Sequence, residues 1–132
     1  MPITVLVADD AEVVRRELRW LLTQLPTIKL VGEAADFAQL VQMARELKPQ
    51  IIVMDLHMVG WEHSSGCRQL KSCLDCGAQL LAVSFSNDEE AKALAEDLGA
   101  VRLLDKMNLY SELVPTIVQL LPTSATSADS TQ

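Results

Sequence analysis

The sequence predicts an α/β fold: a doubly wound, five-stranded parallel sheet covered on both faces by five helices. Short runs of valine, isoleucine and leucine alternate along the chain with longer segments whose apolar residues recur at helical spacing. The short runs are hydrophobic nearly throughout, which is typical of parallel strands buried on both faces. Because crossovers between parallel strands are right-handed, the intervening helices should cover both faces of the sheet.

Five short hydrophobic runs are the predicted strands. Each has the usual length of a strand in a globular protein. They are Ile3–Ala8, Ile28–Gly32, Gln50–Met54, Gln79–Val83 and Val101–Leu104.

The segments between and after these runs each have one apolar face, as expected of amphipathic helices. The faces comprise Val14, Leu18, Leu21, Leu22 and Leu25; Phe37, Leu40, Val41, Ala44 and Leu47; Cys67, Leu70 and Leu74; Ala91, Leu94, Ala95 and Leu98; and Leu113, Ile117, Leu120 and Leu121.

Residues that cap helices support these boundaries. Asp36 is an expected N-cap of the second helix, and Asn87 or Asp88 an expected N-cap of the fourth. Gly99 is expected to end the fourth helix. The third helix has the weakest pattern and is predicted from Gly66 to about Leu74.

Composition favours a single cytoplasmic domain. The chain has 132 residues, a formal net charge of −7 and a pI near 4.7, with no cluster of Lys and Arg, so we expect no nucleic-acid partner. No run is long and apolar enough to span a membrane, and three cysteines do not suggest a disulfide framework. We expect a folded domain over residues 1–121 and a disordered Ser/Thr-rich tail over residues 122–132.

Polar residues interrupt the hydrophobic pattern at the ends of four predicted strands. Asp9 and Asp10 follow the first strand, Asp55 follows the third, Ser84 closes the fourth, and Lys106 follows the fifth. In a doubly wound sheet, ligands bind beyond the carboxyl ends of the strands. The sequence therefore predicts one site that contains three carboxylates, a hydroxyl and an ammonium group.

This set of groups has a definite chemistry. Two carboxylates about 4 Å apart repel each other by roughly 4 kcal/mol at an effective dielectric constant near 20. A divalent cation would relieve the repulsion, and oxygen ligands suit Mg2+ or Mn2+ better than zinc. A carboxylate beside such a cation can attack phosphorus and form an aspartyl phosphate.

Four motifs together resemble the receiver domains of two-component response regulators, the CheY-like superfamily. The resemblance extends from Ile3 to about Leu121 and implies a flavodoxin-like three-layer sandwich with strand order 2-1-3-4-5. In detail it is similar to receivers of LuxR-type regulators, without their DNA-binding domain. The motifs are Val5-Leu6-Val7-Ala8-Asp9-Asp10, Ile51-Ile52-Val53-Met54-Asp55, Ala82-Val83-Ser84 and Leu104-Asp105-Lys106.

The resemblance implies a role for each site residue. Asp55 would be the phosphoacceptor, and Ser84 and Lys106 would contact the phosphoryl oxygens. Asp9, Asp10, Asp55 and the backbone carbonyl of His57 would hold Mg2+, with Mn2+ as the alternative ion.

The resemblance also implies partners. A sensor histidine kinase or a histidine phosphotransfer protein would supply the phosphoryl group. A downstream protein would bind the face formed by helix four, strand five and helix five. The protein would not be an enzyme apart from its self-catalysed phosphotransfer and dephosphorylation, and it would be a monomer or a weak homodimer.

Three positions depart from the family pattern and are expected to modulate access or switching. Leu103 stands where receivers usually have an aromatic residue, three positions before Lys106. Phe85 replaces the small residue that usually follows the switch hydroxyl, and we hypothesise that its ring narrows entry to the site. Trp61 lies in a lengthened loop after Asp55.

Several alternative functions remain open. Leu103 and Phe85 also suit a receiver-like interaction module that is not phosphorylated. A phosphohydrolase of the haloacid-dehalogenase type would need a second acid two residues after Asp55, where His57 stands. A flavodoxin-like nucleotide or flavin binder would need glycines that are absent from the loop after the first strand.

The C-x-x-C formed by Cys73 and Cys76 has two interpretations. It could belong to a zinc or redox site, or its thiols could be buried as small apolar side chains. The sequence favours burial, because no second C-x-x-C pair exists.

Overall fold

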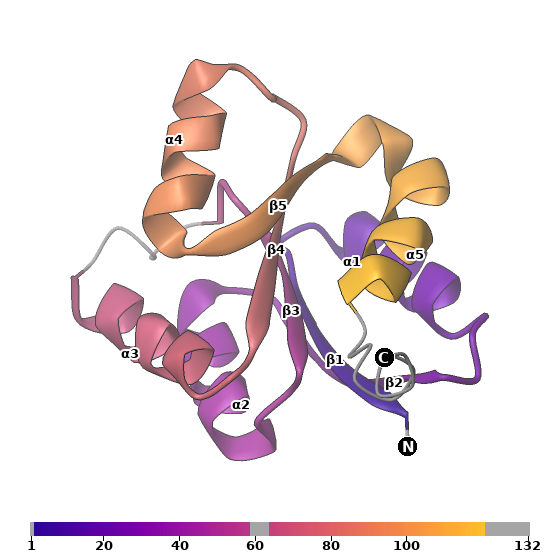
Figure 1. The fold of residues 1–132 in the computed structure, drawn as a ribbon, viewed down its shortest axis with the longest axis horizontal. Coiled ribbons are helices and arrows are strands. Elements are labelled where there is room, and N and C mark those ends of the chain that lie inside the picture. The colour runs from indigo at the N-terminus through magenta and orange to yellow at the C-terminus, as the bar shows by residue number, and fades with distance from the viewer. Residues whose placement is uncertain (1, 59–63, 121–132) are drawn as a thin grey trace, which may run out of the picture.

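Five strands alternate with five α-helices in the computed structural model, which describes residues 2–58 and 64–120, without the side chains of residues 64–67 (Figure 1). The strands are β1 (Ile3–Ala8), β2 (Ile28–Ala34), β3 (Ile51–Asp55), β4 (Gln79–Ser84) and β5 (Ala100–Asp105). The helices are α1 (Glu12–Leu22), α2 (Phe37–Leu47), α3 (Ser64–Asp75), α4 (Glu89–Leu98) and α5 (Leu109–Leu120), and a 3-10 helix, η1 (Lys106–Asn108), precedes α5. None of the helices in these ranges is long and apolar enough to cross a membrane.

The strands form one sheet in the order β2-β1-β3-β4-β5, and each neighbouring pair is parallel. This confirms the predicted α/β fold and its strand order. Because all the strands run in the same direction, their carboxyl ends meet at one edge of the sheet.

The sheet separates two hydrophobic cores. Figure 1 shows α1 and α5 on one face of the sheet, and α2, α3 and α4 on the other. Successive residues of β1 alternate between the cores: Val5 and Val7 belong to the core beside α1 and α5, and Leu6 and Ala8 to the other. This burial on both faces explains why the strand is hydrophobic at every position.

The helix ends agree with most of the predicted caps. The Asp36 carboxylate accepts a hydrogen bond of 2.8 Å from the backbone N–H of Gln39 at the start of α2. Asp88, not Asn87, caps α4, and its carboxylate accepts a hydrogen bond of 2.9 Å from the N–H of Ala91. Gly99 ends α4 with a φ of 86°, a conformation that glycine adopts without steric strain.

Some predicted boundaries are wrong by one or two residues. β2 continues to Ala34, beyond the predicted end at Gly32, because Ala34 still pairs with Ala8 of β1. α3 begins at Ser64, two residues before the predicted start at Gly66. The short helix η1 was not predicted, because three residues are too few to show a helical period in their apolar pattern. The predicted tail at residues 122–132 lies outside the described residues.

Candidate functional site

The three predicted carboxylates lie together at the carboxyl edge of the sheet. Asp9 and Asp10 directly follow β1, and Asp55 is the last residue of β3, which neighbours β1. One carboxylate oxygen from each of the three lies within 4.8 Å of the others. Asp9 and Asp55 are buried, and Asp10 is exposed. The prediction that these side chains meet is therefore confirmed, and one of them faces solvent.

Lys106 joins two of these carboxylates. As the first residue of η1 it follows β5, and its side chain is only 6% exposed. Its Nζ lies 2.8 Å from Oδ2 of Asp9 and 3.2 Å from Oδ1 of Asp55. The predicted ammonium group thus lies between the carboxylates that follow β1 and β3.

Asp9 is the most strongly buried acid of the set. Burial raises the pKa of Asp9 above its ordinary value. Lys106 and a hydrogen bond of 2.9 Å from the N–H of Ala11 to Asp9 Oδ1 offset part of this rise, and the nearby charge of Asp55 adds to it. Asp10 directly precedes Ala11 at the start of α1. The N-cap of this helix is Ala11, which makes no side-chain capping bond, so Asp10 does not serve as the cap.

The donor set fits a hard divalent cation. Asp9 Oδ2 is buried and accepts no hydrogen bond from any described residue, although it lies 2.8 Å from Lys106 Nζ. The Lys106 ammonium group is the charged partner of this oxygen among the described residues. Three carboxylates also carry more negative charge than one ammonium group neutralises. Clustered oxygens with excess negative charge suit Mg2+ or Mn2+.

Ser84 lies at the same edge but faces a different partner. It is the last residue of β4 and is fully buried. Its Oγ accepts a hydrogen bond of 3.0 Å from the N–H of Ser86 and lies 2.9 Å from Nε2 of the His57 ring. In this structure, the Ser84 hydroxyl is therefore held by the loop residues that follow β3 and β4.

Sequence analysis missed two side chains near the site. It used only the backbone carbonyl of His57, whereas the ring contacts Ser84 and the N–H donates to Asp55 Oδ1 over 3.0 Å. It did not consider Arg15 of α1, whose guanidinium donates to the backbone carbonyl of Asp9 over 2.6 Å. The sequence signal for Arg15 is its spacing, since six residues past Asp9 is within reach of the first helical turns.

The three expected modulators have different surroundings. The Phe85 side chain is 63% exposed, and Lys106 Nζ lies 5.0 Å from the centre of its ring. Leu103 of β5 is half-buried and packs against the core beside α2, α3 and α4. Trp61 lies outside the described residues.

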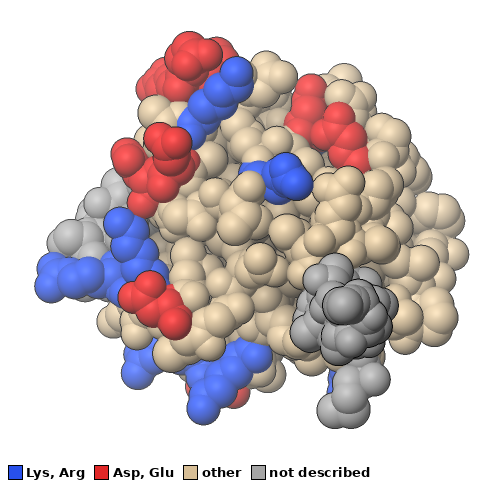
Figure 2. Space-filling view, in the orientation of Figure 1, with Lys and Arg blue, Asp and Glu red and all other residues tan. Residues whose placement is uncertain are grey.

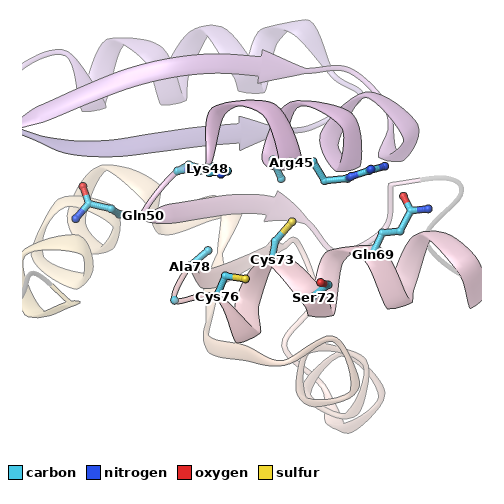
Figure 3. Close-up of a pocket in the computed structure, with 11 residues that line it drawn as sticks. Arg45, Lys48, Gln50, Gln69, Ser72, Cys73, Cys76 and Ala78 are labelled. Carbon is cyan, nitrogen blue, oxygen red and sulfur yellow. The ribbon is translucent and has the colours of Figure 1, made fainter.

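A cavity of about 660 Å3 lies away from these carboxylates (Figure 3). It lies between α2 and α3, beside Gln50 and Ala78, which precede β3 and β4 at the opposite edge of the sheet. Cys73 and Cys76 line it as free thiols. Cys73 is half-buried, but Cys76 is exposed, so the expectation that both thiols are buried is wrong for Cys76. Among the described residues, no group of three metal-ligating side chains includes either cysteine.

Comparison with known proteins identifies one family. The family model described as the response regulator receiver domain matches residues 5–118. The chain is 34% identical over 115 residues to the transcriptional regulatory protein LiaR of Bacillus subtilis, covering 87% of this chain and 54% of LiaR. It is 33% identical over 112 residues to a protein-glutamate methylesterase/protein-glutamine glutaminase of Anaeromyxobacter dehalogenans, covering 85% of this chain and 32% of that protein. The chain thus spans about a third to a half of the length of these relatives.

Solved structures share the fold. A LuxR-family two-component response regulator from Aurantimonas aligns with a TM-score of 0.79 and 28% identity, covering 92% of this chain and 86% of that one. The receiver domain of the NarL response regulator from Mycobacterium tuberculosis aligns with a TM-score of 0.79 at 22% identity, covering 90% of this chain and 95% of that one.

Proposed function

Because the chain belongs to the response regulator receiver domain family, we propose that it accepts a phosphoryl group on Asp55 in a Mg2+-dependent reaction and signals by contact with another protein. The proposal rests on the groups that surround the Asp55 carboxylate. This carboxylate clusters with those of Asp9 and Asp10 and lies 3.2 Å from the ammonium group of Lys106.

Phosphotransfer needs a nucleophile and a way to neutralise the phosphoryl charge. A carboxylate oxygen of Asp55 attacks phosphorus, and the bond from phosphorus to the donor's nitrogen or oxygen breaks with its electron pair leaving on the donor. Lys106 Nζ is close enough to Asp55 to pair with a phosphoryl oxygen, and the Ser84 hydroxyl donates to another after it turns toward Asp55. Asp9, Asp10, Asp55 and the backbone carbonyl of His57 would hold Mg2+ or Mn2+, which would supply further charge neutralisation.

A histidine kinase or a histidine phosphotransfer protein is the proposed donor, and hydrolysis of the aspartyl phosphate is self-catalysed. The protein therefore acts as a cytoplasmic phosphoacceptor and not as an enzyme on other substrates. The methylesterase named among its relatives is a protein of which this chain covers only about a third.

The proposed output face combines α4, β5 and α5. Figure 2 shows acidic side chains gathered over α4 with a basic one among them, beside a mostly tan surface over β5 and α5 that carries a basic patch and an acidic patch. On β5 and α5, Val101, Tyr110 and Val118 are exposed apolar residues. A protein target with basic residues around an apolar centre would complement this surface.

Intact-mass spectrometry tests the proposal. With acetyl phosphate and Mg2+, wild-type protein should gain the mass of one phosphoryl group, and Asp55→Asn should gain none. Chelation of Mg2+ should prevent the gain in wild type. If the wild-type mass stays unchanged with Mg2+ present, the protein is instead an interaction module without phosphorylation, the alternative that Leu103 and Phe85 suggest.

A further inference from the structure

His57 contacts two parts of the site, one through its backbone and one through its ring. Its backbone N–H donates to Asp55 Oδ1 over 3.0 Å, and its ring Nε2 lies 2.9 Å from Ser84 Oγ. One residue thus contacts both the proposed phosphoacceptor at the end of β3 and the proposed switch hydroxyl at the end of β4.

The hydrogen bonds of Ser84 hold its hydroxyl in one position. A serine hydroxyl has one donor and two acceptor sites. One acceptor site receives the Ser86 N–H, and a second site of the hydroxyl is used by the His57 ring. Whichever tautomer the ring has, Oγ is held toward His57. Because Ser84 is fully buried, no bulk water is available to compensate for a broken hydrogen bond.

We infer that the His57 ring is a latch that holds the Ser84 hydroxyl away from Asp55 until a phosphoryl group attracts it. This inference rests on the proposed phosphorylation of Asp55. His57 is therefore a positioning residue. The Ser84 hydroxyl must leave the ring to donate to a phosphoryl oxygen, and the lost hydrogen bond weakens the phosphorylated state.

The latch also gives phosphorylation a route to α4 that does not need an aromatic residue at Leu103. Ser84 is bonded to the N–H of Ser86, and Ser86 lies two residues before Asp88, the N-cap of α4. The Asp88 carboxylate accepts a hydrogen bond of 2.9 Å from the Ala91 N–H, and hydrogen bonds from this N–H and then from the Ser86 hydroxyl hold the pKa of Asp88 below its ordinary value. Movement of the Ser84 hydroxyl would therefore displace Ser86 and, through it, the N-cap of α4.

A double-mutant cycle with the phosphoryl mimic beryllofluoride tests the latch in the presence of Mg2+. His57→Leu keeps a side chain of similar bulk but cannot hydrogen-bond to Ser84. It should tighten beryllofluoride binding by about two- to tenfold, the range expected for one hydrogen bond. In the Ser84→Ala background, His57→Leu should leave the affinity unchanged. His57→Gln is the matched control, because its amide can bond to Ser84, and it should stay close to wild type.

The outcomes separate the latch from the proposed function. The latch is overturned if His57→Leu changes beryllofluoride affinity equally in the wild-type and Ser84→Ala backgrounds. It is also overturned if His57→Leu weakens beryllofluoride binding in the wild-type background. Failure of wild type to gain a phosphoryl group overturns the proposed function instead.

NMR of the free protein tests the latch without any phosphoryl group. The 15N resonance of His57 Nε2 should shift on Ser84→Ala, since its hydrogen-bond partner is removed. An unchanged resonance would overturn the latch whatever the phosphorylation result.

Discussion

Lys106 Nζ lies 2.8 Å from Oδ2 of Asp9, in a contact that leaves 6% of the lysine side chain and none of the aspartate side chain exposed. The same Nζ lies 3.2 Å from Asp55 Oδ1. Without a metal ion, Lys106 is thus the cation nearest to two buried carboxylates among the described residues. The ion pairs of Lys106 with Asp9 and Asp55 should therefore stabilise the fold of the metal-free, unphosphorylated protein.

Replacement of Lys106 by methionine should therefore destabilise the metal-free protein. Removing one partner of a buried ion pair leaves the other charge uncompensated, at a cost of about 3 kcal/mol in the free energy of unfolding. Saturating Mg2+ should reduce this loss, because the metal replaces the missing positive charge. Urea unfolding with chelator and with excess Mg2+ measures both values. The same loss under both conditions would contradict the prediction.

Mg2+ should also stabilise the wild-type protein. A ligand that binds only the folded state adds about 2.7 kcal/mol when its free concentration is a hundred times its dissociation constant. Asp10→Asn is the informative variant, since Asp10 is exposed and its loss should disturb the fold little. Thermal unfolding of this variant should respond much less to Mg2+ than that of wild type. NaCl at matched ionic strength is the control, and an equal rise with NaCl would indicate charge screening alone.

The site residues could be predicted from sequence because hydrophobic runs locate the strands and a parallel sheet brings their ends together. To place Asp9, Asp55 and Lys106, it is enough to locate the ends of β1, β3 and β5. The pattern of apolar residues locates these ends to within one or two positions. The prediction that these groups meet does not depend on any side-chain rotamer.

Contacts that depend on rotamers could not be predicted in this way. The contact between the His57 ring and Ser84 joins residues 27 positions apart and requires one particular orientation of the imidazole. The exposure of Cys76 could not be predicted either. Cys76 lies just beyond the end of α3, and burial was expected only because no second C-x-x-C pair exists, which says nothing of where the side chain lies.

Phe85 should affect the chemistry through Lys106. Its exposed ring lies 5.0 Å from Nζ and is one of the groups around a lysine side chain that is only 6% exposed. Phe85→Ala should raise the rates of both phosphorylation by acetyl phosphate and hydrolysis, because donor and water gain access beside Lys106. Phe85→Tyr keeps the ring and should behave like wild type. Unchanged rates in Phe85→Ala would refute the hypothesis that the ring restricts entry.

The ion pairs of Glu33 should make stability depend on pH. Arg19 of α1 holds the pKa of Glu33 below its ordinary value of 4.5, with a hydrogen bond of 3.0 Å from Nη2 to Oε1. Because the pKa is lower in the folded protein than in the unfolded chain, ionised Glu33 stabilises the fold. That contribution is fully present above the unfolded pKa and is lost as the pH falls through the folded pKa.

Glu33→Gln should therefore lower the melting temperature at neutral pH, and its difference from wild type should shrink as the pH falls below 4.5. The loss should be small and should decrease with added salt, because Arg19 is exposed and water screens the pair. Glu96→Gln removes the same charge from an exposed position of α4 and controls for net charge. Thermal melts of the three proteins from acid to neutral pH make the comparison. A difference between Glu33→Gln and wild type that persists unchanged in acid would mean that Glu33 acts through packing and not through its charge.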